Sequence, residues 1–304
     1  MVGRKLIVIG GPTAAGKTCI AVELAQWLET EIISADSRQI FREMTIGTAV
    51  PSPAELSLVP HHFIQSHSIH QDYSVGQYET EALSLLNELF EKYQTVVLTG
   101  GSGLYIKAVC EGMDVFPEVP VAIRNAIALE YQEKGLAYLQ SEINRLDPEY
   151  AAQVDMQNPH RLIRALAVCR VSGLSYSSFR KGGSIARNFE YLPLAIDPGK
   201  EVLIERINHR VDDMMAAGLL EEARSLYEQR HLTPLQTVGY QELFDYLAGK
   251  TTLAEAVSLI KIHTRQYAKR QRTWFNRQGE WTWFPPEDIT LIKEQARKFL
   301  FGNK

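Results

Sequence analysis

The chain of 304 residues has little cysteine and no long apolar run, and both absences exclude classes of protein. Its three cysteines, Cys19, Cys110 and Cys169, are scattered and form no CxxC pair, which argues against a disulfide framework and against a zinc site. The apolar run near the N-terminus, Leu6–Ile9, is too short for a signal peptide or a membrane span. We therefore expect a cytoplasmic protein that does not associate with membranes.

Acidic residues are absent from two long windows, although the formal net charge of the whole chain is −4. The windows cover residues 156–189 and 256–279. Their basic residues are Arg161, Arg164, Arg170, Arg180, Lys181 and Arg187 in the first, and Lys261, Arg265, Lys269, Arg270, Arg272 and Arg277 in the second. Runs of this kind are often solvated helix faces. Two of them in an acidic protein favour a polyanionic partner.

A phosphate-binding loop of the form G-x-x-x-x-G-K-T follows the first apolar run. It consists of Gly11, Pro12, Thr13, Ala14, Ala15, Gly16, Lys17 and Thr18. Its glycines let backbone N–H groups turn toward phosphate oxygens, its lysine adds a positive charge, and its threonine hydroxyl can bind magnesium at a helix N-terminus. A glycine-rich turn without a ligand is the weaker alternative, because strand, loop and helix follow in the right order.

The order of elements predicts an α/β fold, in which a P-loop core has a parallel sheet flanked by helices. We expect strands at Leu6–Ile9, Ile32–Ala35, Thr95–Thr99 and Leu192–Ile196, with a further one at Trp281–Phe284. Amphipathic helices are expected at Gln77–Tyr93 and Leu253–Asn276. Between residues 112 and 191 no strand is predicted. The chain is therefore expected to have three parts: a first core part at 1–112, a mostly helical insertion at 113–190, and a core completion with a C-terminal helical region at 191–304.

Two further polar positions follow predicted strands, where ligands of parallel sheets gather. Asp36 comes after the second strand, and its carboxylate has three open roles: magnesium ligand, general base, or helix N-cap. Ser102 lies in Gly100–Tyr105, a second glycine-rich turn that binds a phosphate or simply joins a strand to a helix. No other strand-end acid lies near the loop and no Asn-Lys-x-Asp motif occurs, which weakens the ATPase and GTPase interpretations.

Blocks in a fixed order then indicate a family. They read GPTAAGKT, ISADSRQIF, MTIGTAVPS, PHH at 60–62, GGSGLYIKA, QNPHR with RAL, the segment from Arg206 to Met214, TVGY, and TRQYAKRQ-x-TWF ending at Phe275. Together they resemble the tRNA dimethylallyltransferases, also called tRNA isopentenyltransferases, of the bacterial type. Ser102 stands where most members have threonine, so the hydroxyl is retained. The zinc finger of eukaryotic members has no counterpart here.

The resemblance implies a prenyltransferase that moves a dimethylallyl group from dimethylallyl diphosphate to the exocyclic amine of the adenosine 3′-adjacent to the anticodon of tRNA. It implies that the P-loop at residues 11–18, a loop type that often binds nucleotides, holds the prenyl diphosphate here. Mg²⁺ is the implied cofactor, with Thr18 as its ligand. The catalytic residues it implies are Lys17, Asp36 as general base, Ser102 and Arg210.

The resemblance also implies that the anticodon stem-loop is gripped by the insertion and by the C-terminal helix of a monomer. The implied tRNA contacts are Asp36, Ser37, Arg38, Gln39, Arg124, Gln157, Asn158, Pro159, His160, Arg161, Arg164, Lys269, Arg270 and Arg272. Trp274 and Phe275 either stack on bases or pack the helix onto the core. The alternatives are an adenylate isopentenyltransferase acting on free nucleotide, a P-loop small-molecule kinase, and an RNA-binding protein with a vestigial P-loop.

Overall fold

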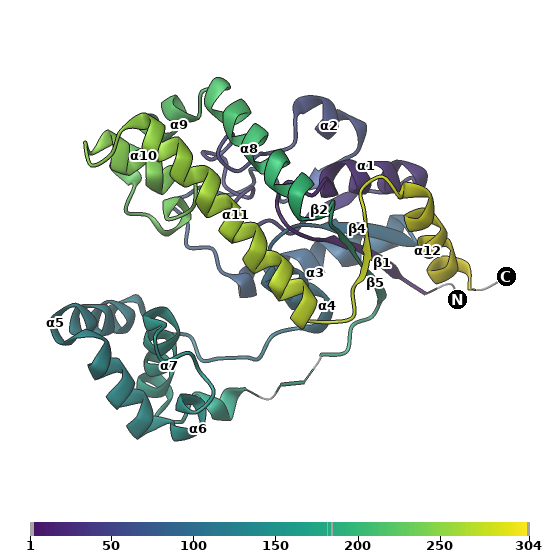
Figure 1. The fold of residues 1–304 in the computed structure, drawn as a ribbon. Coiled ribbons are helices and arrows are strands. Elements are labelled where there is room, and N and C mark those ends of the chain that lie inside the picture. The colour runs from purple at the N-terminus through teal and green to yellow at the C-terminus, as the bar shows by residue number, and fades with distance from the viewer. Residues whose placement is uncertain (1–2, 181, 184, 303–304) are drawn as a thin grey trace. The chain divides into compact units, whose positions relative to one another are not determined.

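The computed structural model describes residues 3–180, 182–183 and 185–302, and its elements are labelled in Figure 1. The chain divides into two compact units. One unit, the core, is Met1–Glu111 with Arg187–Lys304, and the other, the insertion, is Gly112–Ala186. We describe each unit by itself.

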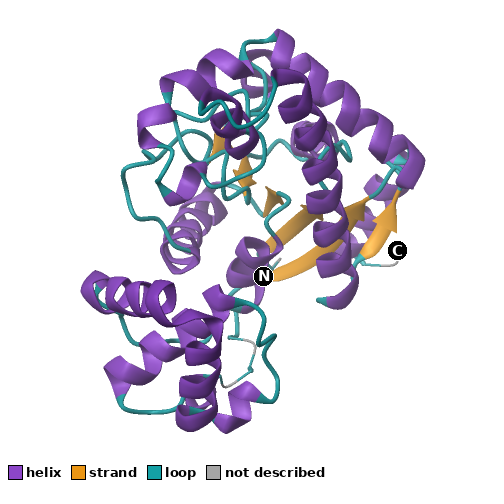
Figure 2. Cartoon of the chain, turned by 60° about the vertical axis from the view of Figure 1, so that its left-hand side comes forward, coloured by secondary structure: helices purple, strands orange, loops and turns teal. Residues whose placement is uncertain are grey.

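The described part of the core contains one parallel sheet of six strands in the order β3-β2-β4-β1-β5-β6. Figure 2 shows the strands of this sheet in orange with helices around them. The strands are β1 (Lys5–Gly10), β2 (Ile32–Ser34), β3 (His61–His62), β4 (Thr95–Thr99), β5 (Glu190–Ile196) and β6 (Thr282–Phe284). The predicted parallel sheet is thus confirmed. Strand β3 was not predicted, because two residues carry no readable alternation.

Side chains alternate across the sheet and bury both of its faces. In β1, Leu6 and Val8 face one hydrophobic cluster, while Ile7 and Ile9 face another. The first cluster includes side chains of α3 (Val75–Lys92) and α4 (Gly103–Glu111), and the second includes side chains of α1 (Lys17–Trp27) and α12 (Ile289–Phe301). A sheet covered on both faces explains why its strands read as continuous apolar runs.

A third cluster lies beside the carboxyl ends of the strands (Figure 1). Its helices are α8 (Lys200–Ala216), α9 (Leu219–Ser225), α10 (Tyr240–Leu247) and α11 (Leu253–Arg277), with short helices η2 (Tyr227–Gln229) and η3 (Thr233–Leu235). The short helix α2 (Pro53–Leu58) has no buried residue and contacts α1 instead. Thr252 and Glu255 form a capping box that starts α11, so this long helix begins where the sequence pattern begins.

The insertion is helical throughout its regular elements. These are α5 (Val121–Leu146), α6 (Pro148–Ala151), α7 (Pro159–Ser172) and η1 (Ser177–Phe179). Helix α5 bends at Gly135, whose φ of +74° lies outside the helical range. We expected the insertion at 113–190, but residues 187–190 lie with the core. Arg187 donates hydrogen bonds to the carbonyls of Val109 (2.9 Å) and Ala108 (2.6 Å), and β5 begins at Glu190.

Candidate active site

The phosphate-binding loop connects β1 to α1, as its motif predicts. Gly11 has a φ of +133°, and a Cβ on it would collide with the carbonyl oxygen of Ile196. Gly16 has a φ of +98° and is the N-cap of α1. Both positions therefore require glycine, and the helix that follows directs its unsatisfied N–H groups at the loop. This geometry suits a bound phosphate.

Lys17 folds back over the loop. Its Nζ donates a hydrogen bond to the carbonyl of Pro12 at 2.7 Å. Burial lowers the pKa of Lys17 to about 8; the nearby Asp36 opposes this shift and Arg210 adds to it. A bound diphosphate would place negative charge next to the Lys17 ammonium and so favour its charged form.

Helix α8 brings two arginines toward the same loop. Arg206 donates from Nη1 to the carbonyl of Ala15 at 3.3 Å. Burial lowers the pKa of Arg210, and Arg206 adds to this effect, whereas Glu55 opposes it. Sequence reasoning assigned Arg210 but not Arg206. Their spacing could have identified Arg206, since residues four apart share a helix face.

Asp36 lies two residues beyond the end of β2 and shapes the turn that follows it. Its Oδ1 accepts hydrogen bonds from the backbone N–H groups of Arg38 (2.9 Å) and Gln39 (3.3 Å). These contacts stabilise a turn at residues 37–40, and the next helix begins only at Pro53, so the helix N-cap role left open by the sequence is wrong. Among the described residues, however, Oδ2 accepts no hydrogen bond. One carboxylate oxygen is fixed by the turn and the other is available for chemistry.

Ser102 joins the turns after β2 and β4. Its Oγ accepts a hydrogen bond from the backbone N–H of Ser37 at 2.9 Å and donates to the Ser37 hydroxyl at 3.1 Å. A Cβ on Gly100 would collide with the carbonyl group of Ala35, so this glycine allows the two turns to approach closely. Ser102 thus positions the segment that begins with Asp36.

Arg38 is a half-buried cation beside Asp36. Burial lowers its pKa, while Tyr267, Asp36 and Tyr105 oppose the shift. Burial also raises the pKa of Tyr267 to about 12, and Asp36 adds to that effect. Tyr267 comes from α11, so this helix contributes to the wall of the site next to the carboxylate.

Gln39 supports a neighbouring loop. Its Nε2 donates to the carbonyls of Thr48 (3.2 Å) and Ala49 (2.8 Å). The same loop is held from α9 by Glu222, whose carboxylate accepts the N–H groups of residues 45, 46 and 47 at 3.1, 2.8 and 2.9 Å. Glu222 also accepts the Tyr240 hydroxyl at 2.6 Å. Sequence reasoning missed Glu222, because it looks like an ordinary acid in a first helical turn.

Some cations of the second basic window form ion pairs with acids, and others are exposed without one. Arg272 forms an ion pair with Asp197 at 2.8 Å, and Lys261 forms one with Asp212 at 2.6 Å. Lys269 and Arg270 are exposed, and no ion pair of either occurs within the described residues. An acid-free window therefore does not mean that its cations lack acidic partners.

Trp274 and Phe275, near the end of α11, pack onto the core. Phe275 is 1% exposed and forms edge contacts with the rings of Trp274 and Trp281. A Cβ on Gly103 would collide with the indole of Trp274. Packing is thus the correct alternative for Phe275.

Most of the polar residues assigned in the insertion lie at its surface. Arg124, Gln157, His160, Arg161 and Arg164 are exposed. Asn158 caps α7 by accepting the N–H of Arg161 at 3.3 Å, and Pro159 is the first residue of that helix.

Other cations of the first window are held by acids from elsewhere in their own unit. Arg170 pairs with Glu130 at 2.7 Å, and Arg187 pairs with Glu79 at 2.6 Å. Lys181 lies outside the described residues.

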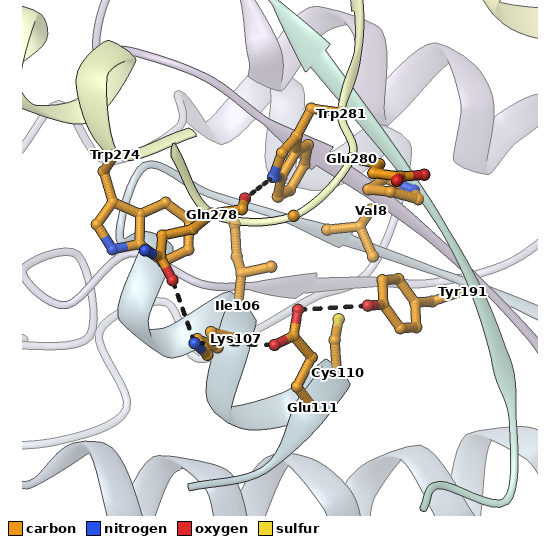
Figure 3. A pocket seen from close by; sticks show the side chains of 12 residues that line it. Val8, Ile106, Lys107, Cys110, Glu111, Tyr191, Trp274, Gln278, Glu280 and Trp281 are labelled. Carbon is orange, nitrogen blue, oxygen red and sulfur yellow. Dashed lines mark hydrogen bonds and ion pairs between the residues drawn. The ribbon is translucent and has the colours of Figure 1, made fainter. Parts of the chain in front are cut away.

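A small cavity lies where α4 packs against the end of α11 (Figure 3). Its volume is about 20 Å³, which accommodates roughly one water molecule. Lys107 donates there to Oε1 of Gln278 at 3.2 Å. The cavity is too small for a prenyl group and belongs to the packing of the core.

Within the described residues, no group of three or more His, Cys, Asp or Glu side chains could hold a metal ion. Magnesium commonly binds through one or two protein oxygens together with substrate phosphates, and the Thr18 hydroxyl at the start of α1 fits that pattern. In the part of the chain that the structure describes, no helix is both long and apolar enough to cross a membrane.

Comparisons with known proteins point to one family. The family model described as IPP transferase matches residues 39–278. A tRNA dimethylallyltransferase of Christiangramia forsetii is 50% identical over 92% of this chain and 92% of its own length. One of Flavobacterium johnsoniae is 48% identical over 99% and 98%. The crystal structure of a tRNA isopentenylpyrophosphate transferase from Bacillus halodurans has a TM-score of 0.72 and 34% identity, covering 98% of this chain and 97% of that one.

Proposed function

Since the chain belongs to the IPP transferase family, we propose that it transfers a dimethylallyl group from dimethylallyl diphosphate to the exocyclic amine of the adenosine 3′-adjacent to the anticodon of tRNA. The observation that carries the proposal is the arrangement of Lys17, Arg206 and Arg210 around the phosphate-binding loop, with the Asp36 carboxylate at the next strand end.

The loop and its cations serve the leaving group. When the bond between the allylic carbon and oxygen breaks, negative charge builds on the diphosphate and positive charge on the allylic carbon. Fixed N–H groups, Lys17 and Arg210 stabilise that negative charge without needing to reorganise. Magnesium, held by Thr18 and phosphate oxygens, would supply further charge stabilisation.

Asp36 serves the acceptor. The lone pair of an adenine amine is delocalised into the ring, so attack on the allylic carbon must be accompanied by proton removal. One oxygen of Asp36 is fixed by the turn, and the other accepts no hydrogen bond among the described residues, which suits a general base. Ser102 keeps this turn in place through Ser37.

Exposed cations on each unit serve the RNA. Arg161 and Arg164 lie on one helix of the insertion, and Lys269 and Arg270 lie on α11 of the core. Each can neutralise an RNA phosphate, while the target base leaves its stack to reach the partly exposed carboxylate of Asp36. We propose that the enzyme works as a cytoplasmic monomer.

The test is mass-spectrometric nucleoside analysis of tRNA after incubation with the protein, dimethylallyl diphosphate and Mg²⁺. A prenylated adenosine next to the anticodon is the expected product, and Asp36→Asn is the matched control. Prenylation of free AMP instead of tRNA would identify an adenylate isopentenyltransferase. Phosphoryl transfer from ATP to a small molecule would identify a kinase.

A further inference from the structure

Helix α11 presses three side chains against the glycines that surround the phosphate-binding loop. Gln271, Trp274 and Phe275 lie on one face of the helix, because they are three and four residues apart. A Cβ on Gly101 would collide with the Gln271 amide, one on Gly103 with the Trp274 indole, and one on Gly10 with the ring of Phe275. The glycines therefore make room for this helix.

Gln271 is the polar member of that face, and it bridges two phosphate-type turns. Its Oε1 accepts the backbone N–H of Thr13 at 2.9 Å, and its Nε2 donates to the carbonyl of Gly101 at 2.9 Å. The side chain is 7% exposed, so neither backbone group can exchange this partner for bulk water without cost. One buried amide thus fixes the loop after β1 and the turn after β4 at once.

We infer that Gln271 is a positioning residue for diphosphate binding and prenyl transfer. By holding the N–H of Thr13, it sets the path of the loop backbone, and with it the direction of the N–H groups that remain for the diphosphate. The hydrogen bond to Gly101 places the turn that carries Ser102. Gln271 acts through the backbone and needs no contact with either substrate. This inference rests on the proposed function, since it assumes that the loop holds a diphosphate.

The first variant is Gln271→Met, which keeps the length of the side chain and removes both hydrogen bonds. We expect its affinity for inorganic pyrophosphate with Mg²⁺, measured by calorimetry, to fall at least about tenfold, together with the single-turnover rate at saturating substrates. Affinity for tRNA should change less than twofold, because the exposed cations of α11 are untouched.

The matched control is Gln278→Met, which removes the amide that contacts Lys107 at the end of the same helix (Figure 3). This glutamine touches neither turn, so pyrophosphate affinity and turnover should stay within twofold of wild type. A loss in the control as large as that in Gln271→Met would assign the effect to general loosening of α11 and overturn the inference.

The second variant, Gln271→Glu, tests the donor and acceptor pattern itself. A protonated carboxyl can accept from Thr13 and donate to Gly101 as the amide does, whereas the ionised form confronts the carbonyl oxygen with a negative charge. Burial raises the pKa of a carboxyl group. Relative to wild type, pyrophosphate affinity of this variant should therefore recover from pH 7.5 to pH 6, while that of Gln271→Met should not.

The outcomes separate the two proposals. A wild-type protein that binds no pyrophosphate would contradict the proposed function. A wild-type protein that binds it, with Gln271→Met binding equally well, would overturn only the positioning role. Failure of Gln271→Glu to recover at low pH would do the same.

Discussion

Replacing Lys17 by methionine should make the folded protein more stable at pH 7 while removing diphosphate binding. Burial lowers the pKa of Lys17 from 10.5 to about 8, so keeping the ammonium charged at pH 7 costs the folded state about 3 kcal/mol. The variant loses the hydrogen bond to the carbonyl of Pro12, which offsets about 1 kcal/mol. The expected net gain is about 2 kcal/mol.

The sign of the pH dependence follows from the lowered pKa. Between about pH 8 and pH 10.5 the unfolded chain binds more protons at this lysine than the folded chain, so wild-type stability rises with pH. The methionine variant has no such contribution. Its advantage over wild type should therefore shrink by about 2 kcal/mol between pH 7 and pH 9.5.

Urea unfolding at both pH values measures this difference directly. Lys200→Met, which removes an exposed lysine at the start of α8, shows what the loss of one positive charge does by itself. The reasoning is refuted if Lys17→Met is less stable than wild type at pH 7 by an amount that stays the same at pH 9.5.

Three further results are expected. Asp36→Asn should slow the chemical step by roughly 10²–10⁴-fold with diphosphate affinity retained, and a single-turnover rate close to wild type would count against a base. Arg161→Ala with Arg164→Ala should weaken tRNA binding and flatten its dependence on log salt by about 0.7–0.9 per lost phosphate contact, leaving diphosphate affinity unchanged; unaltered tRNA affinity over a salt series would make these residues a solvated face. In Glu222→Gln, one amide oxygen cannot accept all the hydrogen bonds that the carboxylate accepts, so the temperature of thermal unfolding should fall and tRNA prenylation should slow. Neither should change if the loop at residues 45–47 keeps its conformation without Glu222.

The sequence predicted the parts of the site that depend on local order. Strand, loop and helix follow one another within residues 6–18, and the glycines define the turn without help from the rest of the chain. Asp36 was placed correctly for the same reason, because the end of a parallel strand can be read from a short apolar run.

Partners from distant segments could not be predicted in this way. Gln271 is 258 residues from Thr13 in sequence, and no local pattern pairs them. The basic windows likewise did not reveal which of their cations form ion pairs. Arg272 obtains its acid from Asp197 and Arg170 obtains one from Glu130, both outside the windows. Counting acids along a chain therefore measures neighbours in sequence, whereas ion pairs depend on neighbours in space.

The hydrogen bonds from Arg187 to the carbonyls of Val109 and Ala108 hold together the two points where the chain leaves and re-enters the core. The insertion therefore leaves and rejoins the core at neighbouring points. The core sheet can form around β1, β4 and β5 whatever the length of the insertion. Because the entropic cost of closing a loop grows only with the logarithm of its length, additions within the insertion place little burden on the core. Because Arg187 holds these two points together, a short turn could replace the insertion and leave the core sheet with its phosphate-binding loop intact.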